Sequence, residues 1–139
     1  MNIRNVLIAD DEPIVLEGLT YIVDWNELGF TVCATASNGQ ETLDKIFSMH
    51  IDLVLLDIRM PKKNGIEVVE EAVSRGFVGK FIILSGVSDF KLAQAAMRYG
   101  VDFYLTKPID EEELAQAVAS VRSLIEKEAR ASLSLNRYR

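Results

Sequence analysis

The chain has 139 residues, of which 49% are hydrophobic and 26% are charged, and its formal net charge is −6. No apolar run is long enough for a membrane span, a single histidine and a single cysteine exclude a His/Cys zinc site, and the negative charge argues against binding nucleic acid. We therefore expect one soluble, cytoplasmic domain that by itself contacts neither a membrane nor nucleic acid.

The first half of the chain predicts two strands, each followed by a helix. An apolar run over residues 3–9 predicts the first strand, and Pro13 begins a helix, since proline is common at the first helical position. A second run covers residues 30–36, and a second helix is expected over residues 40–49. The apolar residues expected to face the sheet are Val15, Leu16, Leu19, Ile22 and Val23 in the first helix and Leu43, Ile46 and Phe47 in the second.

The next part of the chain repeats this pattern. Runs over residues 51–57 and 79–85 predict strands, with helices over residues 65–75 and from about Ser88. The fourth helix has a thin apolar stripe, so we expect it to be the least firmly anchored. The residues expected to face the sheet are Ile66, Val69, Ala72 and Val73 in the third helix and Phe90, Ala93, Ala96 and Met97 in the fourth.

A fifth strand over residues 101–105 precedes the helix with the clearest signal. Three glutamates, residues 111–113, lie in its first turn, where carboxylates stabilise a helix because its N-terminal end is partially positive. We expect residues 1–127 to form one domain and residues 128–139 to be a helical extension or a linker stub, because the apolar stripe ends near Glu126. The residues of that stripe are Leu114, Ala117, Val118, Val121, Leu124 and Ile125.

Charged or polar side chains stand where four of the apolar runs end. Asp10 and Asp11 follow the first run, Asp57 and Ser85 end the third and fourth, and Lys107 follows the fifth. The ends of strands one and three meet only if these strands are neighbours, as in the order 2-1-3-4-5 of a doubly wound sheet. We therefore expect an α/β, flavodoxin-like fold, with a five-stranded parallel sheet in this order and helices on both faces.

Three carboxylates and a lysine at one edge favour phosphoryl chemistry. Close carboxylates repel each other unless a cation neutralises them, and Mg²⁺ binds such oxygen ligands. A carboxylate can attack a phosphoryl group once cations screen the negative charge. Asp57 is the expected nucleophile, because it ends the most apolar run.

With these residues in place, the chain resembles the receiver domains of two-component response regulators, which have a CheY-like fold. The likeness runs from Val6 to Glu126. The motifs that carry it are Asp10-Asp11-Glu12, Asp57-Ile58-Arg59-Met60-Pro61 with Gly65, Ser85-Gly86, and Tyr104-Leu105-Thr106-Lys107-Pro108.

The resemblance implies a role for each site residue. Asp57 would accept a phosphoryl group from the phosphohistidine of a sensor histidine kinase. Mg²⁺ would be held by Asp11, Asp57 and the backbone carbonyl of Arg59, with Asp10 acting through water. Lys107 would pair with the acceptor carboxylate and then with the phosphoryl group.

The resemblance also implies a switch and a cis peptide bond. The Ser85 hydroxyl would move to a phosphoryl oxygen, and the Tyr104 ring would follow inward and change the face made by helix four, strand five and helix five. The bond between Lys107 and Pro108 would be cis. A homodimer on phosphorylation is also implied, and charged residues available to pair across it are Lys91, Arg98, Glu112 and Arg122.

Two further segments, residues 24–30 (Asp-Trp-Asn-Glu-Leu-Gly-Phe) and 88–90 (Ser-Asp-Phe), resemble receivers that precede an AraC-type DNA-binding domain. We expect the chain to be a receiver excised from such a transcription factor, with a stand-alone receiver acting through protein contacts as the alternative. Trp25 is expected to serve local packing.

Two other protein families with related sites fit the sequence less well. A haloacid-dehalogenase-like phosphatase needs a second aspartate two residues after its nucleophile, where this chain has Arg59. A flavodoxin needs a phosphate-binding loop after the first strand, where this chain has three acids. The residues therefore favour a phosphoacceptor over an enzyme with a free substrate.

Overall fold

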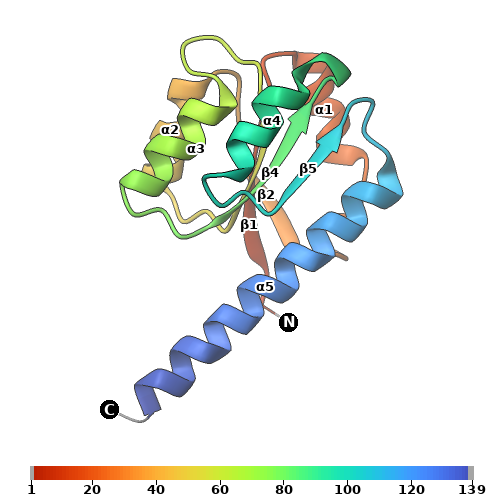
Figure 1. The fold of residues 1–139 in the computed structure, drawn as a ribbon. Coiled ribbons are helices and arrows are strands. Elements are labelled where there is room, and N and C mark those ends of the chain that lie inside the picture. The colour runs from red at the N-terminus through yellow and green to blue at the C-terminus, as the bar shows by residue number, and fades with distance from the viewer. Residues whose placement is uncertain (1, 138–139) are drawn as a thin grey trace.

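The computed structural model describes residues 2–137, and the side chains of residues 2–133. Strands and helices alternate along the described part of the chain (Figure 1). The elements are β1 (Arg4–Ala9), α1 (Pro13–Tyr21), β2 (Phe30–Ala36), α2 (Gly39–Ser48), β3 (Leu53–Asp57), α3 (Gly65–Ser74), β4 (Lys80–Ser85), the 3-10 turn η1 (Val87–Asp89), α4 (Phe90–Met97), β5 (Phe103–Thr106) and α5 (Glu111–Arg137).

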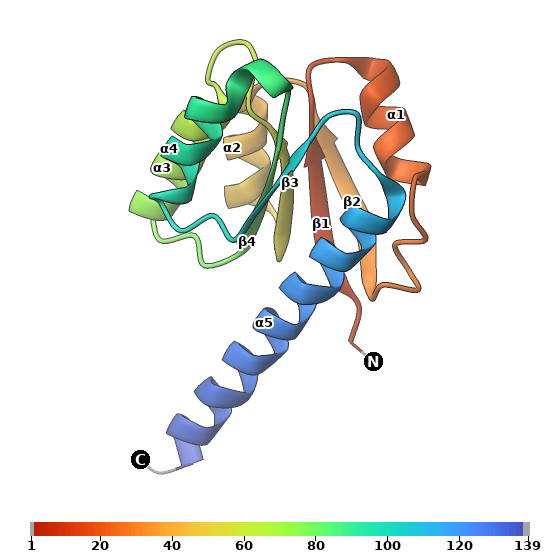
Figure 2. The ribbon, with the colours of Figure 1, turned by 45° about the vertical axis from the view of Figure 1, so that its right-hand side comes forward.

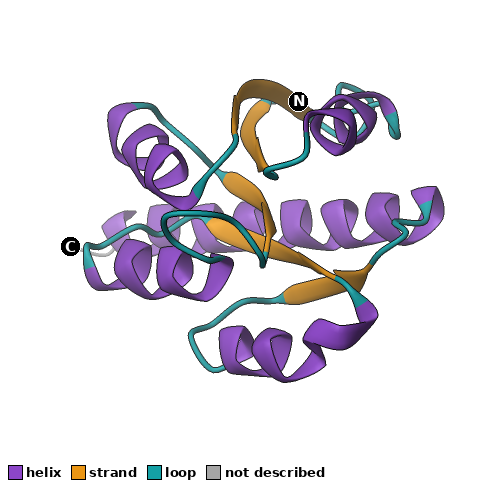
Figure 3. Ribbon diagram, turned by 90° about the horizontal axis from the view of Figure 1, so that it is seen from above, coloured by secondary structure: helices purple, strands orange, loops and turns teal. Residues whose placement is uncertain are grey.

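All five strands are parallel and lie in the order β2-β1-β3-β4-β5, which confirms the predicted topology. Helices α2, α3 and α4 cover one face of the sheet, and α1 and α5 cover the other (Figure 2). Seen from above, the strands form a twisted row with helices on both sides (Figure 3).

The central strands are apolar throughout because both of their faces are buried. In β1, Leu7 and Ala9 pack toward α2 and α3, whereas Val6 and Ile8 pack toward α1 and α5. All four side chains are fully buried. The same period of two holds in β3 and β4, so each central strand contributes to both hydrophobic cores.

In α2 and α3, two residues predicted to face the sheet are exposed instead. Phe47 is 38% exposed and Val73 is 45% exposed, whereas Val68 of α3, which was not among the predicted residues, is fully buried together with Val69 and Ala72. Phe47 lies at the flank of α2, where the Arg75 guanidinium stacks on its ring at 3.9 Å. The prediction was wrong because each helix has a narrower buried face than its apolar composition suggests.

Helix α4 is held by little apolar area. Ala93 and Ala96 are fully buried, but Phe90 and Met97, which we expected to face the sheet, are 52% and 39% exposed. The helix begins at Phe90, after η1, and therefore later than predicted. Two buried methyl groups stabilise this helix far less than the leucines and valines of α5 stabilise theirs.

Helix α5 continues past residue 127 and extends beyond the end of the sheet (Figures 1 and 2). Arg122, expected on an exposed face, is buried and donates from Nη1 to the Gly29 carbonyl and from Nη2 to the Asn2 carbonyl, both at 2.6 Å. Lys80 pairs with Glu128 at 2.6 Å. Arg122 thus anchors α5 to the start of the sheet, and the domain boundary at residue 127 stays a prediction.

None of the helices among residues 2–137 is long and apolar enough to cross a bilayer.

Candidate functional site

The register of the sheet places four of the predicted site residues along one edge. Ala9 pairs with Leu56, so Asp10 and Asp57, which come next, lie side by side. Asp57 pairs with Leu84, directly before Ser85. Ser85 pairs with Thr106, directly before Lys107. The carboxyl ends of β1, β3, β4 and β5 therefore meet at this edge.

The Lys107 ammonium lies between two buried carboxylates. Its Nζ donates a hydrogen bond to Asp10 Oδ2 at 2.9 Å and lies 3.3 Å from Asp57 Oδ1. Asp10 is fully buried and Asp57 is 5% exposed. The Lys107 backbone N–H donates to the Ser85 carbonyl at 2.8 Å, and the Lys107–Pro108 bond is cis. The lysine therefore neutralises charges that water barely reaches.

Burial and charge shift the pKa values of this group. Burial raises the pKa of Asp57, and the Asp10 charge adds to it, so that the pKa goes from 3.8 to about 6 despite the opposing effects of Lys107 and a backbone hydrogen bond at Arg59. For Lys107, burial lowers the pKa, but the hydrogen bond to Asp10 and the charge of Asp57 raise it more. Near pH 7 Asp57 is mostly ionised beside a protonated lysine.

Asp10, Asp11 and Glu12 form an acidic cluster in which one carboxylate oxygen of each lies within 4.8 Å of the others. Both oxygens of Asp10 are already engaged, since Oδ1 accepts from the Glu12 N–H at 2.9 Å and Oδ2 accepts from Lys107. Asp11 and Glu12 are exposed. A set of carboxylates open to water fits Mg²⁺, which takes few protein oxygens and keeps several waters.

The loop after Asp57 is held close to the site. The Ile58 N–H donates to the Leu84 carbonyl at 2.9 Å, and the Gly65 N–H donates to the Ile58 carbonyl at 2.8 Å. A Cβ at Gly65 would lie 2.8 Å from Ile58 Cα and 2.9 Å from the Asp57 carbonyl oxygen. Glycine is therefore required at position 65 for α3 to begin this near the acceptor.

Proteins that are similar to this chain in sequence and fold include response regulators. Residues 6–119 match the family described as the response regulator receiver domain. The chain belongs to this family. It is 35% identical over 116 residues to the uncharacterized transcriptional regulatory protein YesN of Bacillus subtilis, an alignment that covers 84% of this chain and 32% of that protein.

Two solved structures support the same assignment. The REC domain of AraT, a response regulator from Geobacillus stearothermophilus, is 36% identical with a TM-score of 0.86, over 91% of this chain and 98% of that one. A two component transcriptional regulator AraC from Clostridium phytofermentans is 28% identical with a TM-score of 0.82, over 89% and 96%. The predicted family, CheY-like fold and likeness to AraC-type regulators are confirmed.

The chain spans about a third to a half of the length of the curated relatives it matches. The comparison is therefore between this receiver domain and one part of each relative.

The two residues expected to act as a switch lie in different surroundings. Ser85 is 2% exposed and ends β4 at the site edge. Tyr104 is 36% exposed, and the structure leaves its ring on the surface of the receiver domain rather than in the site. Side chains alternate along β5, where Phe103 and Leu105 are the half-buried residues.

Prediction from the sequence missed one buried acid near the site. The Asp89 carboxylate is 5% exposed, pairs with the Arg59 guanidinium and accepts a hydrogen bond from the Gly86 N–H at 3.2 Å. An aspartate at the start of a helix is typical of a helix cap, so its residue type gives no sign of this ion pair. The partner, Arg59, lies 30 residues earlier, and no local pattern joins the two.

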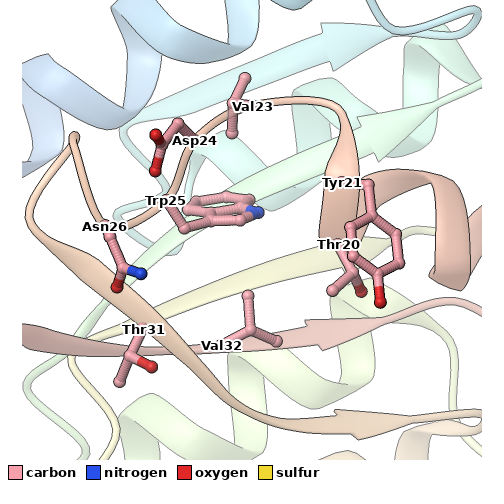
Figure 4. A pocket seen from close by; sticks show the side chains of 8 residues that line it. All are labelled: Thr20, Tyr21, Val23, Asp24, Trp25, Asn26, Thr31 and Val32. Carbon is pink, nitrogen blue, oxygen red and sulfur yellow. The ribbon is translucent and has the colours of Figure 1, made fainter.

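A hollow of about 340 Å³ lies between the end of α1, the following loop and the start of β2, away from the acidic cluster (Figure 4). The Trp25 ring contributes to its wall, is 5% exposed and donates from Nε1 to the Leu19 carbonyl at 3.0 Å. These contacts support the expected packing role of Trp25 in the receiver domain.

Proposed function

We propose that this receiver domain takes a phosphoryl group on Asp57 from the phosphohistidine of a sensor histidine kinase. The observation that carries the proposal is a buried carboxylate at the end of β3, with the Lys107 ammonium 3.3 Å away. A carboxylate oxygen attacks phosphorus, the bond from phosphorus to the histidine nitrogen breaks, and the nitrogen keeps the electron pair. The domain reacts on its own side chain and has no free substrate to turn over.

The charges around Asp57 suit this reaction. A pKa of about 6 leaves the carboxylate ionised near pH 7 while keeping it more basic than a solvated aspartate, which favours nucleophilic attack. Lys107 then gives positive charge to the incoming phosphoryl oxygens, and its link to Asp10 keeps it in place.

Mg²⁺ is the expected cofactor. Asp11, Asp57 and the backbone carbonyl of Arg59 would hold the ion, with Asp10 acting through water because both of its oxygens already accept hydrogen bonds. A bound Mg²⁺ supplies positive charge that screens the carboxylates from the phosphoryl group.

The output is expected on the face made by α4, β5 and α5. A phosphoryl oxygen would attract the Ser85 hydroxyl, and Tyr104 would move from the surface toward the space that the hydroxyl leaves. Weak anchoring of α4 through Ala93 and Ala96 supports a change on this face. The changed face would form a homodimer and control an AraC-type DNA-binding domain in the longer, cytoplasmic protein.

Intact-protein mass after incubation with acetyl phosphate tests the proposal. One phosphoryl adduct that requires Mg²⁺ and is absent from Asp57→Asn is the expected result. Asp52→Asn is the matched control, because Asp52 is also buried but accepts from the Asn5 N–H at the opposite end of the sheet. A folded wild-type protein without an adduct, or an equal adduct on Asp57→Asn, would refute the assignment.

A further inference from the structure

Two loops that flank Asp57 are joined by one ion pair. Arg59, in the loop after β3, donates from Nε to Asp89 Oδ1, in the turn η1 after β4. The other oxygen, Asp89 Oδ2, accepts from the Gly86 N–H at 3.2 Å, and the Asp89 N–H donates to the Gly86 carbonyl at 3.0 Å. Asp89 is thus fixed by its own turn and in addition holds a cation from the neighbouring loop.

The two partners differ in how firmly they are held. Asp89 is 5% exposed, whereas the Arg59 side chain is 65% exposed. The buried carboxylate is the rigid partner, and the long arginine side chain is the one that can move. If the Arg59 guanidinium moved away, the nearly buried Asp89 carboxylate would have no cation beside it, which costs free energy. Burial of Asp89 therefore favours the state in which Arg59 stays bound to it.

Arg59 lies in the loop that directly follows the proposed phosphoacceptor. It comes two residues after Asp57, the last residue of β3. A guanidinium can bind a phosphoryl group through two parallel hydrogen bonds. These bonds add binding energy and fix the geometry, whereas a lysine ammonium acts as a point charge. In this structure that guanidinium is bound to Asp89, and the ammonium of Lys107 is the cation beside Asp57.

We propose that Asp89 is a positioning residue that competes with the phosphoryl group for Arg59, holding the guanidinium on the β4–α4 turn until position 57 is phosphorylated. This inference rests on the proposed function, since it takes Asp57 as the acceptor. When Arg59 moves to the phosphoryl group, the link between the two loops opens. The turn that begins α4 then loses a constraint, and the residues 87–97 are released as a unit held mainly by Ala93 and Ala96.

The substitution Asp89→Asn tests the competition. The amide oxygen still accepts from the Gly86 N–H, but the neutral side chain no longer holds the guanidinium. With Arg59 free beside Asp57, the rate of phosphorylation by acetyl phosphate should rise roughly three- to tenfold, and the acetyl phosphate concentration for half-maximal rate should fall. In an Arg59→Gln background the same Asp89 substitution should change the rate by less than about twofold, because the competed group is missing.

Two controls separate this role from a structural one. Asp52→Asn removes a buried, paired carboxylate from the opposite end of the sheet and should leave the rate unchanged. Asp89→Ser, which keeps an oxygen for the Gly86 N–H, should raise the rate as Asp89→Asn does. Far-UV circular dichroism shows whether each variant is folded.

The outcomes are distinct. A faster Asp89→Asn, with the gain lost in Arg59→Gln, supports the proposal. If wild-type protein is phosphorylated on Asp57 but the folded Asp89 variants are no faster, the competition is refuted and the proposed function stands. If wild-type protein takes no phosphoryl group, both fail. If neither Asp89 variant folds, the pair is a requirement of the fold, and its assignment as a competitor is wrong.

Discussion

The substitution Asp57→Asn should make the protein more stable near neutral pH while removing its phosphoacceptor. Asp57 is 5% exposed and lies beside Asp10, a second buried carboxylate, and these two charges share Lys107. Asparagine has nearly the same shape and carries no charge. It therefore relieves the repulsion and the loss of hydration that raise the pKa of Asp57.

The size and pH range follow from this pKa. The pKa of Asp57 rises from its ordinary value of 3.8 to about 6 in the folded protein. Since each pKa unit corresponds to about 1.36 kcal/mol, ionised Asp57 should lower the free energy of unfolding by about 3 kcal/mol. Because the folded state holds the proton more tightly than the unfolded state, ionising Asp57 destabilises the fold. The advantage of Asp57→Asn should be absent below about pH 4, grow between pH 4 and 6, and be complete above about pH 7.

Urea unfolding measures this difference. The single tryptophan, Trp25, is buried and reports unfolding by fluorescence, and far-UV circular dichroism gives a second probe. Both proteins should be measured from pH 4 to 8 in the presence of a chelator, so that no metal ion neutralises the carboxylates. Equal slopes against urea would show that the free energies of unfolding can be compared directly.

Asp52→Asn is the matched control for this experiment. Asp52 is also buried but accepts a hydrogen bond from the Asn5 N–H at 2.8 Å and lies 4.0 Å from Arg4. Removing a carboxylate with such partners should destabilise the fold by about 1 kcal/mol. If Asp57→Asn is no more stable than wild type at pH 8, the proposed destabilisation of the fold by the ionised Asp57 carboxylate is refuted. A gain in stability that is equally large at pH 4 would refute it as well.

Three further substitutions test other contacts. Lys107→Met leaves the carboxylates of Asp10 and Asp57 without their cation, so the pKa of Asp57 should rise above 6. A carboxyl-carbon NMR titration that gives a pKa of 6 or less would contradict this. Gly65→Ala places a methyl group 2.8 Å from Ile58 Cα and should lower the free energy of unfolding by about 2 kcal/mol; unchanged stability in urea would show that the loop adapts. Arg122→Met removes the hydrogen bond to the Gly29 carbonyl and should cost about 2 kcal/mol with faster amide exchange in α5, whereas unaltered exchange would argue against its role as an anchor.

The order of the strands and the edge that holds the site could be predicted from the sequence. Four of the five apolar runs end at or just before a charged or polar site residue, and parallel strands place such ends at one edge. The register pairs of Ala9 with Leu56 and of Ser85 with Thr106 follow the order that this argument predicted. The strand over residues 30–36 also has the predicted bounds, because a β-branched and aromatic run indicates a strand locally.

The helix faces were less predictable. Phe47 and Val73 are apolar and at helical spacing, but they lie at the flanks of α2 and α3. Which flank is covered depends on the neighbouring helix and on side chains such as Arg75, which stacks on Phe47. Periodicity locates the centre of a buried face and leaves its width to the packing.

The fold class, the strand order and the residue types at the site follow from the amino-acid sequence, because the hydrophobic period and the charges at the strand ends are local properties of the chain. How those residues are paired follows from the packing of the folded chain. The raised pKa of Asp57, the burial of Arg122 and the link between Arg59 and Asp89 each depend on segments far apart in sequence. Burial and the distance between charges set their energies, and both are properties of the folded chain alone.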